Sequence, residues 1–266
     1  MGKTIIEIDR LDIDSLVPLR DKTTWSNGGA IYLIIGPSGS GKSTLILDIM
    51  KSKKDFIPIS VAVSETESIN NTFSKHIPPL FIYEKHSKEL VEKIISRQMV
   101  ASRMLPNPWL TLVLDDCMNK TRNLNDDSHV QLFKTGRHYK MLVLISCQYS
   151  LDLKPDLRNQ CAGLFIMRNN NKESRDKIYT NFASIIPTRA LFDMLMDVLT
   201  TDRCCMFINN RCTSDDWRDS VKWYKAGIDT GDFIAASLDT QHFNNQRLDP
   251  NYNSDEAVLY KVFNRK

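Results

Sequence analysis

One stretch decides the fold of this chain: Gly36-Pro37-Ser38-Gly39-Ser40-Gly41-Lys42-Ser43-Thr44. It matches the phosphate-binding pattern G-x-x-x-x-G-K-[ST]. An apolar run at residues 30–35 precedes it and a second at 45–50 follows it, which is the strand–loop–helix context that the motif requires. Glycines let backbone N–H groups turn toward phosphate oxygens at the N-terminus of a helix. The stretch therefore predicts a nucleotide-binding loop rather than a glycine-rich turn that matches by accident.

Two side chains of this loop have expected roles of their own. The motif predicts that Lys42 reaches the β and γ phosphates and that the Ser43 hydroxyl binds Mg²⁺. ATP and Mg²⁺ are therefore the expected cofactors. The expected nucleotide-binding residues are Gly36, Pro37, Ser38, Gly39, Ser40, Gly41, Lys42, Ser43 and Thr44.

Another apolar run, residues 110–114, ends in Asp115 and Asp116. This is the shape of a Walker B motif, in which Asp115 would hold Mg²⁺ through water and Asp116 would polarise the attacking water. Consecutive residues of a strand point to opposite sides, which suits one metal ligand and one base. The alternative is a strand that runs into an acidic turn, because Asp is common where strands end.

A further apolar run, residues 141–146, leads into Cys147-Gln148-Tyr149. The carboxyl end of a strand is where ligands bind in open α/β sheets. If this strand lies between the strand of the phosphate loop and that of Asp115, Gln148 can touch both the γ-phosphate and the attacking water. Otherwise Gln148 is an ordinary loop residue.

Length and composition limit the class of protein. At 266 residues and 42% hydrophobic, the chain can bury a large core as one α/β domain. No apolar stretch approaches the roughly 20 residues that span a bilayer, and no signal peptide is visible, so we expect an intracellular protein without membrane insertion. The six cysteines show no C-x-x-C pairing and are expected to be reduced, buried thiols. A net charge of +3 does not by itself indicate nucleic acid.

Alternating strands and helices predict a mostly parallel sheet covered on both faces. We expect one domain over residues 1–226, which includes an N-terminal strand at 4–13, and a polar C-terminal extension over 227–266. Further strands are expected at 56–63, 110–114, 141–146, 162–167 and 204–208, and helices at 87–104, 127–138, 172–182 and 188–199.

The order of these features resembles the FtsK/HerA superfamily of DNA-pumping ATPases. Behind the phosphate loop and the Asp115-Asp116 strand come Gly136-Arg137-His138-Tyr139-Lys140 and the strand that ends before Gln148. The chain most resembles the genome-packaging ATPases of poxviruses and other large nucleocytoplasmic DNA viruses, over residues 30–209. One departure is that the cellular motors usually carry Asp-Glu where this chain has Asp115-Asp116.

The resemblance implies a RecA-like P-loop ATPase that translocates double-stranded viral DNA into a capsid. It also implies that the strand before Gln148 is inserted between the strand of the phosphate loop and the strand of Asp115. It implies a homo-oligomeric ring, a pentamer or hexamer, that docks on a capsid or portal component in the host cytoplasm (the viral factory) or in the virion. An arginine from the neighbouring subunit would complete each site. Arg137 is the first candidate for this arginine, called an arginine finger, and Arg158 and Arg175 are the alternatives. The expected catalytic residues are Lys42, Asp116, Gln148 and Arg137, and the expected metal ligands are Ser43 and Asp115.

Two other functions fit a P-loop chain of this size. One is a nucleotide or metabolite kinase, although the Asp-Asp strand and Gln148 favour hydrolysis over transfer. The other is a nucleotide-binding scaffold that hardly turns over. For the motor, the polar segment 117–125, with Lys120 and Arg122, is a candidate DNA grip because it leaves directly from the metal-binding strand; an ordinary solvated loop is the alternative.

Overall fold

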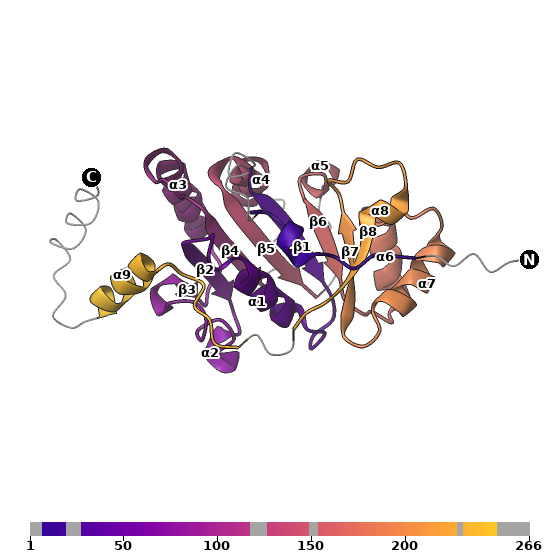
Figure 1. Cartoon of the computed structure of the whole chain (residues 1–266), viewed down its shortest axis with the longest axis horizontal. Helices are drawn as coiled ribbons and strands as arrows, with labels where there is room; N and C mark the ends of the chain where they lie inside the picture. Colours follow the sequence, from indigo (N-terminus) through magenta and orange to yellow (C-terminus); the bar gives the residue numbers. More distant parts are fainter. Residues whose placement is uncertain (1–6, 20–27, 118–126, 149–153, 228–230, 249–266) are drawn as a thin grey trace, which may run out of the picture.

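The computed structural model describes residues 7–19, 28–117, 127–148, 154–227 and 231–248. Its centre is an eight-stranded sheet of order β3-β2-β4-β5-β1-β6-β7-β8, shown in Figure 1. The strands from β3 to β6 are parallel, and β7 and β8 are antiparallel to their neighbours. Their bounds are β1 Ala30–Ile35, β2 Ile59–Ser64, β3 Ile82–Tyr83, β4 Leu110–Asp115, β5 Met141–Cys147, β6 Gly163–Ile166, β7 Cys204–Asn209 and β8 Val221–Lys225.

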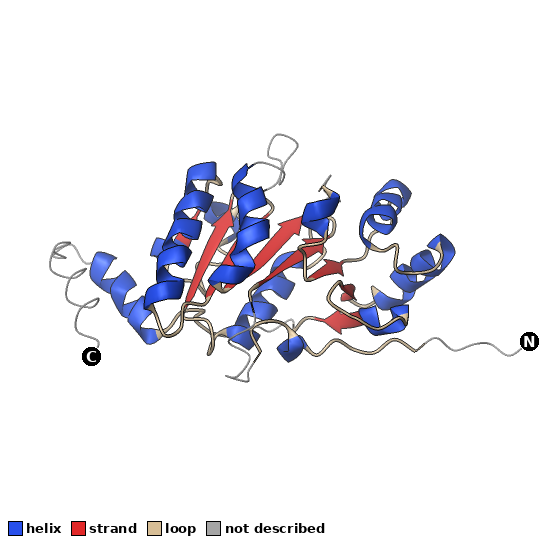
Figure 2. Cartoon of the chain, turned by 90° about the horizontal axis from the view of Figure 1, so that it is seen from above, coloured by secondary structure: helices blue, strands red, loops and turns tan. Residues whose placement is uncertain are grey.

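Helices cover both faces of this sheet, as Figures 1 and 2 show. They are α1 Lys42–Lys53, α2 Glu67–Asn70, α3 Lys88–Met104, α4 Asp127–Thr135, α5 Pro155–Arg158, α6 Lys172–Phe182, α7 Arg189–Leu199, α8 Trp217–Ser220 and α9 Leu238–Leu248. Short 3-10 turns are η1 Ile13–Ser15, η3 Pro79–Phe81 and η4 Gly136–Tyr139. The predicted fold class, a P-loop α/β domain with a mostly parallel sheet, is confirmed.

The core consists of two apolar layers, one on each face. Along β1, Ile31 and Leu33 belong to the layer under α3, α4, α6 and α7, while Tyr32 and Ile34 belong to the layer under α1. Every residue of β1 is buried. Strands that are covered on both faces read as continuous apolar runs, which is why the sequence shows runs rather than alternation here.

Several expected boundaries agree with the structure. The expected helix at 87–104 is α3, and Ser87 caps it by accepting a hydrogen bond from the Leu90 N–H. The strand that leads to Gln148 lies between the phosphate-loop strand and the Asp115 strand, because β5 pairs with both β1 and β4. This insertion was predicted from the family resemblance and is confirmed.

The N-terminal strand predicted at 4–13 is wrong within the described residues. Only Arg10 pairs there, as an isolated bridge to Trp223. Asp12 instead caps the turn η1 by accepting a hydrogen bond from the Asp14 N–H at 3.0 Å. A side chain that bonds its own local backbone competes with a strand ladder, and this competition ends the extended segment.

The strand expected at 56–63 starts later, at Ile59, directly after Pro58. Proline has no N–H to give to a ladder, so Pro58 precedes β2, which lies next to the two-residue edge strand β3. Of the six thiols, Cys117, Cys147, Cys161 and Cys205 are buried, and Cys204 and Cys212 are half-buried. Burial raises the pKa of Cys117 to about 12.

The described part of the C-terminal extension, residues 231–248, packs on the β2–β3 side of the domain (Figure 1). Phe233 stacks on His76 with ring centroids 4.3 Å apart, and the Ala235 N–H donates to the His76 carbonyl at 2.7 Å. In α9, the Asn244 side-chain oxygen accepts a hydrogen bond from the Leu80 N–H at 3.1 Å. These contacts could not be predicted from the sequence, because the segment is polar.

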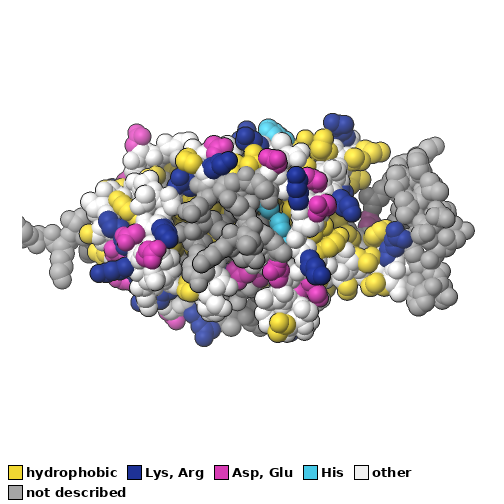
Figure 3. Space-filling model, turned by 180° about the vertical axis from the view of Figure 1, so that it is seen from behind, with side chains coloured by type: hydrophobic (Ala, Val, Ile, Leu, Met, Phe, Trp, Pro, Cys, Tyr) yellow, Lys and Arg dark blue, Asp and Glu magenta, His cyan; other side chains and the backbone are white. Residues whose placement is uncertain are grey.

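The described residues form a surface that carries charges of both signs, and they include no helix that could span a membrane. On the face seen in Figure 3, Lys and Arg side chains are interspersed with Asp and Glu, in keeping with a net charge of +3. Among the described helices, none is both long and apolar enough to cross a bilayer.

Replacing Phe233 tests whether the C-terminal segment is part of the core. Phe233 is 5% exposed, so Phe233→Ala is expected to lower the free energy of unfolding by about 3–5 kcal/mol. Leu238→Ala is the matched control, because Leu238 is 81% exposed and its loss should change stability by about 0.5 kcal/mol or less. Urea denaturation measures both. Equal, small effects would show that the segment does not pack on the domain in solution.

Candidate functional site

The phosphate loop joins the carboxyl end of β1 to α1. Gly41 is the N-cap of α1, has a φ of 96° and leaves the helix without a side-chain cap. A left-handed residue is accessible to glycine at no steric cost, and an uncapped helix start offers N–H groups to an anion. At Gly36 a Cβ would lie 2.5 Å from the Cβ of Met167, so that glycine is needed for packing.

Lys42 lies over the loop it belongs to and is 5% exposed. Its Nζ donates to the carbonyl oxygens of Gly36 at 3.1 Å and Pro37 at 3.2 Å. The same Nζ lies 3.5 Å from Oδ2 of Asp116. The ammonium group is therefore held among oxygen atoms at the point where the motif expects a phosphate.

Asp115 ends β4 directly beside Ser146 of β5. Its Oδ2 accepts a hydrogen bond from the Ser43 hydroxyl at 3.3 Å, and its Oδ1 accepts one from the Ser146 hydroxyl at 2.5 Å. Burial raises the pKa of the Asp115 carboxyl above its ordinary value, and the hydrogen bond from Ser146 opposes that rise. The structure thus brings together the two predicted metal ligands, Ser43 and Asp115.

Asp116 turns to the other side, toward Lys42 and Gln148. Its φ of 49° is uncommon for a residue with a side chain, and its N–H donates to the Ser146 hydroxyl at 3.0 Å. Nε2 of Gln148 donates to Oδ2 of Asp116 at 3.3 Å. The predicted base, Asp116, and Gln148 are therefore in direct contact.

Two buried oxygens at this site lack a hydrogen-bond partner within the described residues: Oδ1 of Asp116 and the hydroxyl of Ser40. A buried polar atom without a partner carries a desolvation cost, so both atoms are suited to a polar ligand or water. Oxygen donors such as Ser43 and Asp115 also suit Mg²⁺, which binds a protein through one or two carboxylates together with phosphates and water. Among the described residues, no group of three or more His, Cys, Asp or Glu side chains is placed so that it could hold a metal ion. A magnesium ion at this site would therefore need phosphate and water oxygens as further ligands.

Arg137 lies far from this cluster. It is exposed and belongs to η4, which precedes β5, whereas Asp115 and Gln148 lie at the carboxyl ends of their strands. A seven-residue strand at about 3.3 Å per residue separates these two edges of the sheet by roughly 20 Å. Arg137 cannot reach its own phosphate loop, so a role at a nucleotide requires a neighbouring copy.

The two alternative arginines have partners in their own subunit. Arg158 donates to the side-chain oxygen of Asn181 at 2.6 Å. Arg175 is 8% exposed and pairs with Asp197 at 2.6 Å and Asp193 at 3.3 Å. These contacts indicate structural roles and leave Arg137 as the remaining candidate of the three.

Sequence reasoning missed Ser146 as a site residue. Its hydroxyl donates to Asp115 and accepts from the Asp116 N–H, so it positions both acids. The only signal was a serine inside an apolar strand. Glu67 is another carboxylate near the carboxyl end of β2. It accepts hydrogen bonds from the Phe73 and Ser74 N–H groups, which indicates a structural role.

The chain is similar in sequence to proteins of large DNA viruses. It is 43% identical over 225 residues to protein 088R of Invertebrate iridescent virus 3, covering 84% of this chain and 86% of that protein. It is 40% identical over 223 residues to protein 015R of Frog virus 3, covering 83% and 69%. No family model matches the chain.

Solved structures share its fold at low sequence identity. The DNA-packaging ATPase B204 of Sulfolobus turreted icosahedral virus superposes with a TM-score of 0.55 and 15% identity, over 76% of this chain and 99% of that one. The pCW3 conjugation coupling protein TcpA gives a TM-score of 0.53 and 11% identity, over 83% and 64%. The predicted resemblance to FtsK/HerA-like packaging ATPases is thereby confirmed at the level of the fold.

Asp116→Asn tests the assignment of Asp116. The amide keeps the shape but removes the charge that holds Lys42 and can polarise water, so phosphate release should fall at least about 100-fold while ATP affinity stays equal or rises. Lys42→Ala is the contrasting variant and should lose both binding and turnover. Titration with a fluorescent ATP analogue and a phosphate-release assay measure the two quantities. Release at the parent rate would place the base on another residue.

Proposed function

The chain belongs to a family of large-DNA-virus proteins that includes 088R of Invertebrate iridescent virus 3, and from this premise we propose that it is an ATP-hydrolysing motor for packaging viral DNA. The observation that carries the proposal is the meeting of three strand ends. Lys42 follows β1, Asp116 follows β4 and Gln148 follows β5, and the Asp116 carboxylate contacts both of the others. This set of groups suits hydrolysis of a terminal phosphate.

In the proposed reaction, N–H groups of the loop after Pro37 and the Lys42 ammonium bind the triphosphate of ATP. Ser43 and Asp115 would hold Mg²⁺, which when bound would neutralise charge on the phosphate oxygens. Lys42 then has a phosphate in place of the Asp116 carboxylate as its anionic partner. Asp116, still held by Gln148, orients the attacking water and accepts its proton. The water oxygen bonds to the γ-phosphorus while the bond to the β-phosphate oxygen breaks, and ADP and phosphate leave.

The proposed partners are double-stranded DNA, further copies of the chain in a ring, and a capsid or portal component. The fold shared with a DNA-packaging ATPase and a conjugation coupling protein supports DNA handling. The position of Arg137 is compatible with a ring, because an arginine that acts on a neighbouring copy's nucleotide joins two different surfaces, and such a heterologous contact forms a ring where its rotation closes. Lys120 and Arg122, the candidate DNA grip, lie outside the described residues. We propose the host cytoplasm and the virion as its locations.

The assay that tests this function is phosphate release from Mg²⁺-ATP with and without duplex DNA. A DNA motor is expected to release phosphate faster when DNA is present. A kinase would instead transfer phosphate to a small nucleotide or metabolite acceptor, and a scaffold would stay silent under all conditions. Lys42→Ala is the control that assigns the activity to this site. Release that is Lys42-dependent yet unaffected by DNA would contradict the motor.

Arg137→Ala tests the ring. Arginine fingers contribute about 10³–10⁵ in rate, so this variant should bind ATP and hydrolyse it hardly at all. When it is mixed with Lys42→Ala, some interfaces combine an intact phosphate loop with an intact Arg137, and part of the activity should return. Absence of recovery at every mixing ratio, in assemblies shown to contain both variants, would exclude a finger that acts between subunits.

A further inference from the structure

The phosphate machinery occupies one side of the phosphate loop. Asp115 ends β4, and Gln148 follows β5, and both strands lie on the same side of β1 in the sheet. These residues set where the γ-phosphate is processed. The nucleoside of a bound ATP must then extend toward another part of the strand ends.

The strand on the opposite side of β1 is β6. Ile35 pairs with Ile166, and the Met167 N–H donates to the Ile35 carbonyl at 2.8 Å. At the start of the phosphate loop, a Cβ on Gly36 would lie 2.5 Å from the Cβ of Met167, so the residue before Arg168 packs against this loop. On its other side β6 pairs with β7, with Ile166 opposite Met206, and Nη1 of Arg168 lies 3.5 Å from the hydroxyl of Thr201, just before β7. Arg168 thus lies between the phosphate loop and the turn that begins β7.

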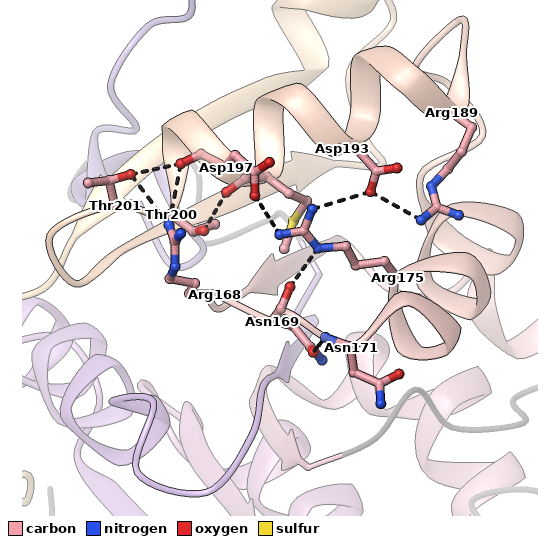
Figure 4. A network of polar contacts seen from close by, with 10 residues as sticks. Arg168, Asn169, Asn171, Arg175, Arg189, Asp193, Asp197, Thr200 and Thr201 are labelled. Carbon is pink, nitrogen blue, oxygen red and sulfur yellow. Dashed lines mark hydrogen bonds and ion pairs between the residues drawn. The ribbon is translucent and has the colours of Figure 1, made fainter.

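Arg168 belongs to the polar network of Figure 4, which links the end of β6 to α6 and α7. In that view its guanidinium lies at the Thr200–Thr201 end and Arg189 at the other. The other two arginines hold carboxylates: Arg175 pairs with Asp197 at 2.6 Å and Arg189 with Asp193 at 3.1 Å.

Arg168 is held more weakly than these two. It is exposed, and its Nη1 contacts are the Asp197 carbonyl at 3.4 Å and the Thr201 hydroxyl at 3.5 Å. Both distances are beyond the usual range of an N–H···O bond. Oδ1 of Asp197 is engaged by Arg175. The Arg168 guanidinium can therefore change partner at small cost.

From this position and this weak attachment we infer that Arg168 binds the nucleoside half of ATP, with its guanidinium plane against the purine ring. An arginine plane stacks on aromatic rings and is weakly hydrated. Arg168 is a binding residue on this account, and it takes no part in the chemistry at the γ-phosphate. The inference rests on the proposed ATP-binding function.

Two ligands separate this role from phosphate binding: ATP, and inorganic tripolyphosphate, which lacks the nucleoside. Calorimetric titration in Mg²⁺ buffer is expected to show ATP binding weakened by about 2-fold to 30-fold in Arg168→Ala, the range of a cation–π contact. Tripolyphosphate affinity should be unchanged. Arg189→Ala is the matched control, because it cuts the same network at its far end, and it should leave both affinities as in the parent.

Three results would overturn the inference. Equal loss of affinity for both ligands would mean that Arg168 acts on the phosphates or on the loop. Unchanged ATP affinity would mean that it does not contact the nucleotide. The same pattern in Arg189→Ala would assign the effect to the network. Each of these leaves ATP binding by the parent chain intact, whereas a parent chain that binds neither ligand would remove the proposed function together with the inference.

Discussion

The register of three parallel strands is the constraint on which the site depends. β1, β5 and β4 pair so that Ile35 lies beside Cys147 and Asp115 beside Ser146, and the Gly36 N–H donates to the Cys147 carbonyl at 3.1 Å. The residues that follow these positions consequently emerge at one level. A slip of one residue turns every side chain of a strand to the other face, and it would separate the acids from the phosphate loop.

The meeting of these strand ends produces a competition for Lys42. Its side chain is 5% exposed, and its ammonium group is shared by two carbonyl oxygens and the Asp116 carboxylate. A buried charge needs partners, and a triphosphate offers more negative charge than one carboxylate. On our account, nucleotide binding therefore draws Lys42 away from Asp116 and frees that carboxylate for water. Gln148 keeps its hydrogen bond to the Asp116 carboxylate during this change, so nucleotide binding prepares the site for hydrolysis.

The sequence was informative where the signal is local. The glycine pattern before Lys42, the acids after β4 and the amide after β5 each follow a continuous apolar run, and their convergence followed from the strand order that the family resemblance implied. Ser146 could not be assigned from sequence, because its role arises only when β5 lies beside Asp115. The contacts of Phe233 and Asn244 were missed because they join residues more than 150 positions apart in the chain. The N-terminal segment was misassigned because the turn capped by Asp12 overrides its apolar alternation.

The most direct test is an experimental structure with Mg²⁺ and a non-hydrolysable ATP analogue. The quantity to measure is the distance from Nζ of Lys42 to Oδ2 of Asp116, which is 3.5 Å in the structure described above. We predict that it exceeds ion-pair range, with Lys42 on the phosphates and the contact between Gln148 and Asp116 retained. A nucleotide bound at the loop with the pair from Lys42 to Asp116 still closed would contradict the account.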